Sequence, residues 1–145
     1  MIDPKNLDEN SPSVQAHLQI LQSVINRMAA NSGATKAWCV SLVAAILVLV
    51  GDKGKPQLLL IAVIPTLLFF ILDTYYLALE RGFRTSYRSF ITHLHAGRLT
   101  ATNLYEVVPE GSLGWGFLKA LLSFSVWPFY FTLGGTIGLA RIIIG

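Results

Sequence analysis

The sequence predicts an all-α integral membrane protein, in which an antiparallel transmembrane helical hairpin extends into the cytoplasm and a third transmembrane helix follows at the C-terminus. Hydrophobic residues make up 53% of the 145 residues, and charged residues only 13%, whereas about a quarter of the residues in soluble domains are charged. Apolar runs recur three times along the chain, and amphipathic stretches flank the first two. Such a chain is expected to have the lipid bilayer as its main partner.

The first part of the chain is polar and then becomes amphipathic. Residues 1–12 contain Pro4 and Pro12 among polar side chains, which predicts a flexible N-terminal arm. A helix is predicted from about residue 13 to 33, because apolar residues recur every three or four positions on one face. These residues are Val14, Leu18, Leu21, Ile25 and Met28.

Two apolar spans follow, at about 34–51 and 57–79, joined by the turn-forming sequence GDKGKP at 51–56. A bilayer core requires about 20 apolar residues, so the first span needs the residues just before its apolar run. An arginine-rich amphipathic helix continues the second span, so that the predicted hairpin covers 13–97.

The C-terminal part is predicted as a loop at 98–112, containing Pro109 and Gly111, and then as an interfacial lead-in and third span at 113–145. The span itself is expected from about Ala120 to Ala140. Trp115 and Lys119 are of the types that lie at headgroup level in the lead-in.

Lysine and arginine placement predicts a cytoplasmic N-terminus. Eight basic residues then lie on the cytoplasmic side and three on the outer side. The inner group is Lys5, Arg27, Lys36, Arg81, Arg84, Arg88, Arg98 and Lys119, and the outer group is Lys53, Lys55 and Arg141. Basic cytoplasmic segments of this kind account for the net charge of +3. We expect no nucleic-acid partner, because no binding module is recognisable.

The short turn fixes the register of the hairpin. Both helices rise equally per residue, so with Gly54 at the apex facing residues have numbers that sum to about 108. Phe83, Tyr87, Phe90 and Leu94 then face Ile25, Leu21, Leu18 and Val14. Two heptad stripes align by chance in about one register of seven, so the match supports a hairpin that continues beyond the membrane.

The same register predicts a polar layer between the helices. Asp73 lies inside the second apolar run, where an isolated charge costs about 3 kcal/mol, and its predicted partner is Lys36. Glu80 is expected to pair with Arg27 in the same way, and Asn31 lies between the two pairs. Two interpretations stay open: the layer fixes the hairpin register, or it is a gate or ion contact.

Two further patterns have more than one interpretation. Gly134 and Gly138 form a small-xxx-small motif, which packs the third span either on its own hairpin or against another protomer. Arg81, Arg84 and Arg88 lie on one side of a helix. They are either simple cytoplasmic positive charge or a site for anionic headgroups or a nucleotide.

Catalytic and metal-binding patterns are absent from the sequence. No nucleophile–base set, phosphate-binding loop or pair of catalytic carboxylates is recognisable, so we expect no enzyme activity and no cofactor. His17, His93 and His95 are poorly spaced to bind one metal ion. They are expected on polar faces or as pH-responsive groups of the cytoplasmic helices.

Parts of the hairpin resemble known bacterial membrane proteins. The segments HLQILQSVINRMAANS at 17–32, KAW at 36–38, LDTYYLALER at 72–81 and FR at 83–84 resemble a group of small, uncharacterised bacterial membrane proteins. More loosely, residues 14–96 resemble the SLATT two-transmembrane effectors of bacterial conflict systems, from which the third span is a departure.

The resemblance implies an oligomeric effector of the bacterial inner membrane that forms a channel or disrupts the membrane in antiphage defence. Its activation would require a separate sensor protein or a nucleotide signal, since the chain contains no recognisable sensor. The alternative is a non-catalytic membrane subunit or scaffold that docks a partner through its cytoplasmic helical pair.

Overall fold

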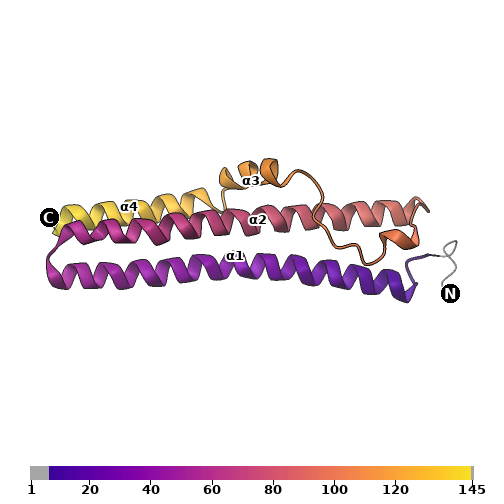
Figure 1. Cartoon of the computed structure of the whole chain (residues 1–145), viewed down its shortest axis with the longest axis horizontal. Coiled ribbons are helices and arrows are strands. Elements are labelled where there is room, and N and C mark those ends of the chain that lie inside the picture. Colours follow the sequence, from indigo (N-terminus) through magenta and orange to yellow (C-terminus); the bar gives the residue numbers. More distant parts are fainter. Residues whose placement is uncertain (1–6, 145) are drawn as a thin grey trace.

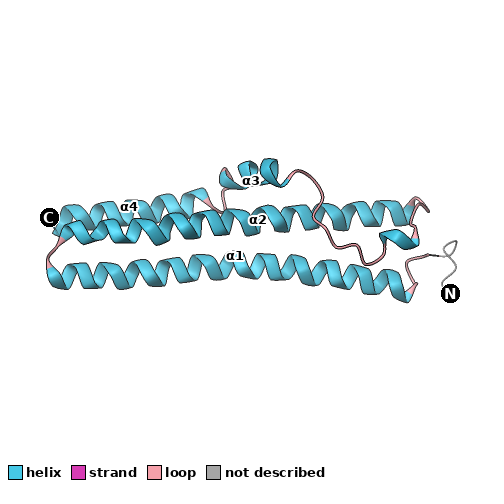
Figure 2. Ribbon diagram, viewed as in Figure 1, coloured by secondary structure: helices cyan, strands magenta, loops and turns pink. Residues whose placement is uncertain are grey.

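A computed structural model describes residues 7–144, and the first half of the predicted N-terminal arm lies outside them. The described chain consists of helices and connecting loops, without strands (Figures 1 and 2). The helices are α1 (Pro12–Lys53), α2 (Leu60–His95), α3 (Leu113–Leu121) and α4 (Trp127–Ile144), with short 3-10 helices η1 (Pro56–Leu59) and η2 (Ala101–Asn103).

The helices α1 and α2 lie antiparallel along almost their whole length (Figure 1). The turn between them begins at Gly54, which has the left-handed backbone angles φ 57° and ψ 31° that glycine adopts at least cost. With 42 residues, α1 is about 63 Å long at 1.5 Å per residue. This is about twice the hydrocarbon thickness of a bilayer, so a membrane can contain only half of the hairpin.

The apolar seam of the hairpin has the register that the sequence predicts. Val14 and Leu18 share one cluster with Phe90 and Leu94. Leu21 and Ile25 share the next cluster with Phe83 and Tyr87. The pairing about Gly54 is therefore confirmed in the half of the hairpin distant from the turn.

The start of α1 is more ordered than the predicted flexible arm. Pro12 occupies the first helical turn, where its missing N–H costs nothing. Before it, the Ser11 hydroxyl donates to the Asp8 carboxylate over 2.8 Å, and Leu7 packs against the end cluster of the hairpin. Residues 7–11 thus form a turn that closes the apolar end of the helix pair.

The third long helix, α4, lies beside the half of the hairpin that holds the Gly54 turn, and its C-terminal end lies next to that turn (Figure 1). It begins at Trp127, so the predicted start near Ala120 was wrong. Ala120 ends up in α3, and a turn follows in which the Ser123 N–H donates to the Ala120 carbonyl. Pro128 occupies the first turn of α4, a position that proline tolerates.

Three helical segments in residues 7–144 are long and apolar enough to cross a membrane: Pro12–Lys53, Pro56–His95 and Trp127–Ile144. Large apolar side chains are exposed in the half of the molecule that holds the Gly54 turn, including Val48, Ile64 and Phe131 at 70–76% exposure. Exposed apolar surface on this scale is typical of contact with lipid or protein rather than water.

Candidate functional site

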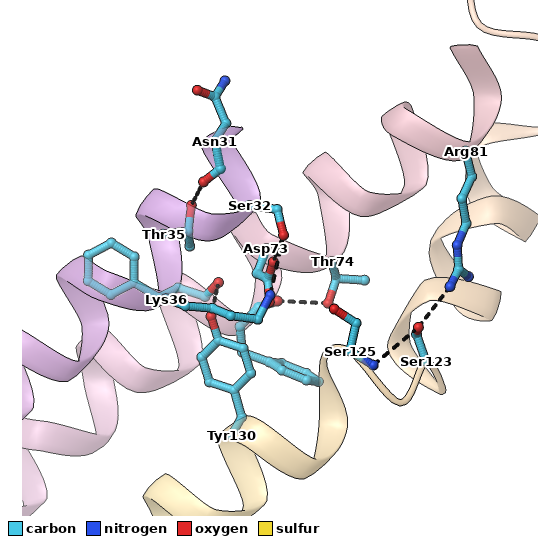
Figure 3. Close-up of polar contacts among 12 residues, drawn as sticks. Asn31, Ser32, Thr35, Lys36, Asp73, Thr74, Arg81, Ser123, Ser125 and Tyr130 are labelled. Carbon is cyan, nitrogen blue, oxygen red and sulfur yellow. Dashed lines mark hydrogen bonds and ion pairs between the residues drawn. The ribbon is translucent and has the colours of Figure 1, made fainter. Parts of the chain in front are cut away.

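A buried ion pair joins α1 to α2 near the start of α4 (Figure 3). The Asp73 side chain has no exposed surface, and its Oδ2 lies 2.6 Å from Lys36 Nζ, whose side chain is 20% exposed. The Ser32 hydroxyl donates to Asp73 Oδ1, and Lys36 Nζ donates to Ser32 Oγ over 3.3 Å. The structure therefore confirms the predicted contact between Asp73 and Lys36.

The local sequence explains how α1 supplies two partners to one carboxylate. Ser32 and Lys36 are four residues apart and so lie on the same face of the helix. Within the described residues, Asp73 Oδ2 accepts no hydrogen bond of good geometry, and Lys36 Nζ is its ion-pair partner. The charge balance of the buried carboxylate therefore depends on one ammonium group.

The third helix contributes to the same layer through Tyr130. Its hydroxyl donates to the Phe69 carbonyl over 3.1 Å, and its ring meets Phe70 edge-on with centroids 5.2 Å apart. Thr74, which is fully buried, donates to the Phe70 carbonyl over 2.7 Å. Tyr130 was missed by the sequence reasoning, because no short turn fixes the register of α4 against α2. Thr74 was also missed, although it directly follows Asp73 in α2.

The second predicted ion pair does not form. Glu80 Oε1 accepts a hydrogen bond from Arg84 Nε over 2.8 Å within α2, so the prediction that Glu80 pairs with Arg27 was wrong. A partner four residues away on the same face is reached without crossing between helices. Asn31 takes part through its backbone carbonyl, which accepts from the Thr35 hydroxyl over 2.7 Å.

Gly134 and Gly138 lie on open faces of α4. A Cβ atom added at either position would meet no other group within 4 Å, so the interpretation that they pack α4 on its own hairpin was wrong. Gly134 borders a groove of about 400 Å³ between α2 and α4. Its lining is Val63, Thr66, Leu67, Phe70, Trp127, Tyr130, Phe131, Gly134 and Ile137. Both glycines are thus free to approach lipid or another protomer.

The three predicted headgroup-binding arginines are all exposed but have different surroundings. Arg81 Nη2 donates to Ser123 Oγ over 2.7 Å (Figure 3), and its Nη1 donates to the Lys119 carbonyl over 3.4 Å. Arg84 pairs with Glu80, while the Arg88 guanidinium has no ion pair in the described chain. Binding of an anion by this face stays a prediction.

A second polar contact lies at the far end of the hairpin, at His17. The side chain is 1% exposed, which corrects the expectation of a polar-face position. Its Nδ1 accepts a hydrogen bond from the Tyr105 backbone N–H over 2.9 Å. The centroids of the His17 and Phe90 rings lie 4.3 Å apart. Burial lowers the pKa of His17. Tyr105 has a φ of 68°, which is uncommon for a non-glycine residue.

The loop that His17 contacts covers a polar cavity of about 260 Å³. Its lining comes from α1, α2 and the loop, and consists of His17, Leu21, Ser86, Ser89, Phe90, His93, Asn103, Glu106, Val108 and Glu110. No group of three or more His, Cys, Asp or Glu side chains within residues 7–144 is placed to hold a metal ion.

Comparison of the chain with protein-family models, with curated proteins and with solved structures gives no match. The fold and the site define an all-α protein with three helices able to cross a membrane and a buried acid–base pair where they meet.

Proposed function

We propose that this chain is a non-catalytic effector of the bacterial inner membrane, with a cytoplasmic N-terminus, that self-associates and makes the bilayer permeable to ions. The observation that carries the proposal is the Asp73–Lys36 pair, buried where three apolar helices meet. An acid and a base inside a membrane-spanning segment are costly and typically mark ion pathways or gates.

The pair holds the closed state. With Lys36 neutralising Asp73, neither helix presents a net charge to the bilayer at this level. Separating them would leave a carboxylate in a low-dielectric environment, unless water enters between the helices. An open state therefore requires a hydrated space, which neighbouring protomers can enclose.

Self-association is assigned to α4. Only Tyr130 and Ile137 of this helix are buried, and Gly134 and Gly138 leave room for close approach of another backbone. Between helices in lipid, such close packing replaces the hydrophobic driving force that acts in water.

The trigger is assigned to the cytoplasmic half of the hairpin. From Pro12 to Lys36, α1 extends about 36 Å beyond the buried pair at 1.5 Å per residue. A sensor protein or nucleotide signal that bends or parts these helices would act directly on Lys36 and Asp73. The role in antiphage defence is proposed from the sequence resemblance of residues 14–96 to the SLATT effectors.

Ion flux across liposomes tests this proposal. Full-length protein is reconstituted at increasing density with a potassium gradient and a voltage-sensitive dye. Lys36→Met, which leaves Asp73 unpaired, is expected to raise the rate of depolarisation well above that of the wild type. Glu80→Gln, which breaks an ion pair at the surface of α2, is the matched control and should behave as the wild type does. Intact gradients with every variant at every density would remove the effector proposal.

A second candidate, a scaffold that docks a partner through the cytoplasmic hairpin, is favoured by the polar cavity beneath the 98–110 segment. A scaffold of this kind would leave the liposome gradient intact in the wild type and in Lys36→Met. It would instead lose partner recovery from membranes when the hairpin end is altered, for example by Phe90→Ala.

A further inference from the structure

A cavity with two basic side chains lies between α2 and α3, beside the proposed inner surface of the membrane. Its volume is about 250 Å³. The lining includes Arg81, Thr85 and Gly82 from α2, and Trp115 and Lys119 from α3. Arg81 lies eight residues beyond Asp73 in α2, or about 12 Å at 1.5 Å per residue, which places it near headgroup level.

The Arg81 guanidinium is held in place without being neutralised. Two of its nitrogens donate to Ser123 Oγ and to the Lys119 carbonyl, and neither acceptor is charged. A guanidinium carries five N–H donors, so further donors stay available for an anion. Within residues 7–144, neither Arg81 nor Lys119 forms an ion pair, although Glu110 also lines the cavity.

Lys119 and Trp115 connect this cavity to an apolar hollow. Lys119 Nζ lies 5.5 Å from the centroid of the Trp115 ring. Both residues also line the neighbouring hollow of about 370 Å³, together with Leu118, Leu121 and Leu122. On α3 and just after it, Trp115, Leu118 and Leu122 are 52–83% exposed, as in helices that lie in the membrane interface.

We propose that Arg81 and Lys119 bind the phosphate of one anionic phospholipid of the inner leaflet, while an acyl chain covers Leu118 and Leu122. The adjoining apolar hollow favours a lipid over free inorganic phosphate, because inorganic phosphate has no apolar part that could fill the hollow. This site differs from the one predicted from sequence, which consisted of Arg81, Arg84 and Arg88 on a single helix. Arg84 forms an ion pair with Glu80, and neither Arg84 nor Arg88 lines this cavity.

The site depends on membrane insertion but not on channel formation, so the two proposals can fail independently. The bound lipid would hold α3 against α2 at the level where the connection to α4 begins.

Native mass spectrometry of the full chain, extracted from membranes containing phosphatidylglycerol and phosphatidylcholine, tests the site. The wild type should retain one phosphatidylglycerol in preference to phosphatidylcholine. The double variant Arg81→Gln/Lys119→Gln should retain about tenfold less. Arg84→Gln/Arg88→Gln removes the same charge from the same surface and should retain the lipid as the wild type does.

Arg81→Lys/Lys119→Arg keeps both charges and should bind the lipid, which separates loss of the site from a fold defect. The proposal is overturned by equal retention of both lipids in the wild type or by equal loss in the two glutamine variants. Displacement of phosphatidylglycerol by inorganic phosphate, with no effect of the apolar substitution Leu118→Ser, would assign the site to a soluble anion instead.

Discussion

Lys36 Nζ and Asp73 Oδ2 lie 2.6 Å apart across the hairpin, and Tyr130 of α4 donates to the Phe69 carbonyl one helical turn away. The three apolar helices therefore meet in a layer that contains one full acid–base pair. The layer lies next to the N-terminal part of α4, which contributes Tyr130 (Figure 3).

The hydrogen bond between His17 and the Tyr105 N–H predicts a pH-dependent loop. Burial lowers the pKa of His17 below its value of 6.5 in the unfolded chain, so the unfolded state binds more protons in the interval between the two values. The contribution of His17 to stability is therefore complete above pH 6.5 and is lost as the pH falls toward the folded-state pKa. Protonated Nδ1 can no longer accept from Tyr105.

Hydrogen exchange at Tyr105 measures this effect. Its amide is expected to exchange faster as the pH falls below 6.5, after correction for intrinsic rates, in the wild type but not in His17→Gln, where the titrating group is missing. His95→Gln, near the same end of the hairpin, is the control and should follow the wild type. Uniform protection of Tyr105 across this pH range would contradict the role given to His17.

A side chain at Gly54 is expected to be destabilising, for conformational reasons alone. A Cβ atom would meet no neighbour there, but the backbone φ is +57°, which costs an L-residue about 1–2 kcal/mol. Gly54→Ala should therefore destabilise the hairpin by about 1 kcal/mol. Gly51→Ala, at a helical position with equal space, should be stabilising by up to about 1 kcal/mol. Thermal unfolding in detergent measures both, and equal effects of the two changes would rule out this account of the turn.

Gly138 is expected to matter for association but not for the fold of one chain. Gly138→Leu should leave the fold intact and should not lower the thermal unfolding temperature, because a Cβ atom added there meets no other group and leucine is a better helix former than glycine. It should lower energy transfer between donor- and acceptor-labelled chains in liposomes severalfold. Gly135→Leu places the same bulk on another side of α4 and serves as the comparison. Unchanged energy transfer in Gly138→Leu would place the protomer contact elsewhere.

The hairpin was predictable from sequence because a short turn at Gly54 ties two long helices to one register. That register led correctly to Lys36 beside Asp73 and to Leu18 in the cluster of Phe90. Glu80 was assigned to the wrong partner. The register predicts which residues of α1 and α2 face each other, but it does not show that Arg84, four residues later in α2, competes for Glu80.

The rest of the site depends on contacts without a sequence signal. A long connection separates α2 from α4, so neither the start of α4 nor the contact of Tyr130 with Phe69 follows from spacing. His17 lies three residues after Val14 and four before Leu21, on the buried face of α1, so its burial had a sequence signal that was missed. Its hydrogen bond with the Tyr105 N–H had none, because 88 residues separate the two.

A double-mutant cycle on Lys36 and Asp73 tests the central ion pair most directly, with the free energy of unfolding measured for the full chain in bilayers or bicelles. Lys36→Met leaves a buried carboxylate uncompensated and should cost about 3–5 kcal/mol, whereas Lys36→Met/Asp73→Leu should recover most of that loss. Single and double changes whose effects simply add would show that the two groups do not interact and would contradict the proposed gate.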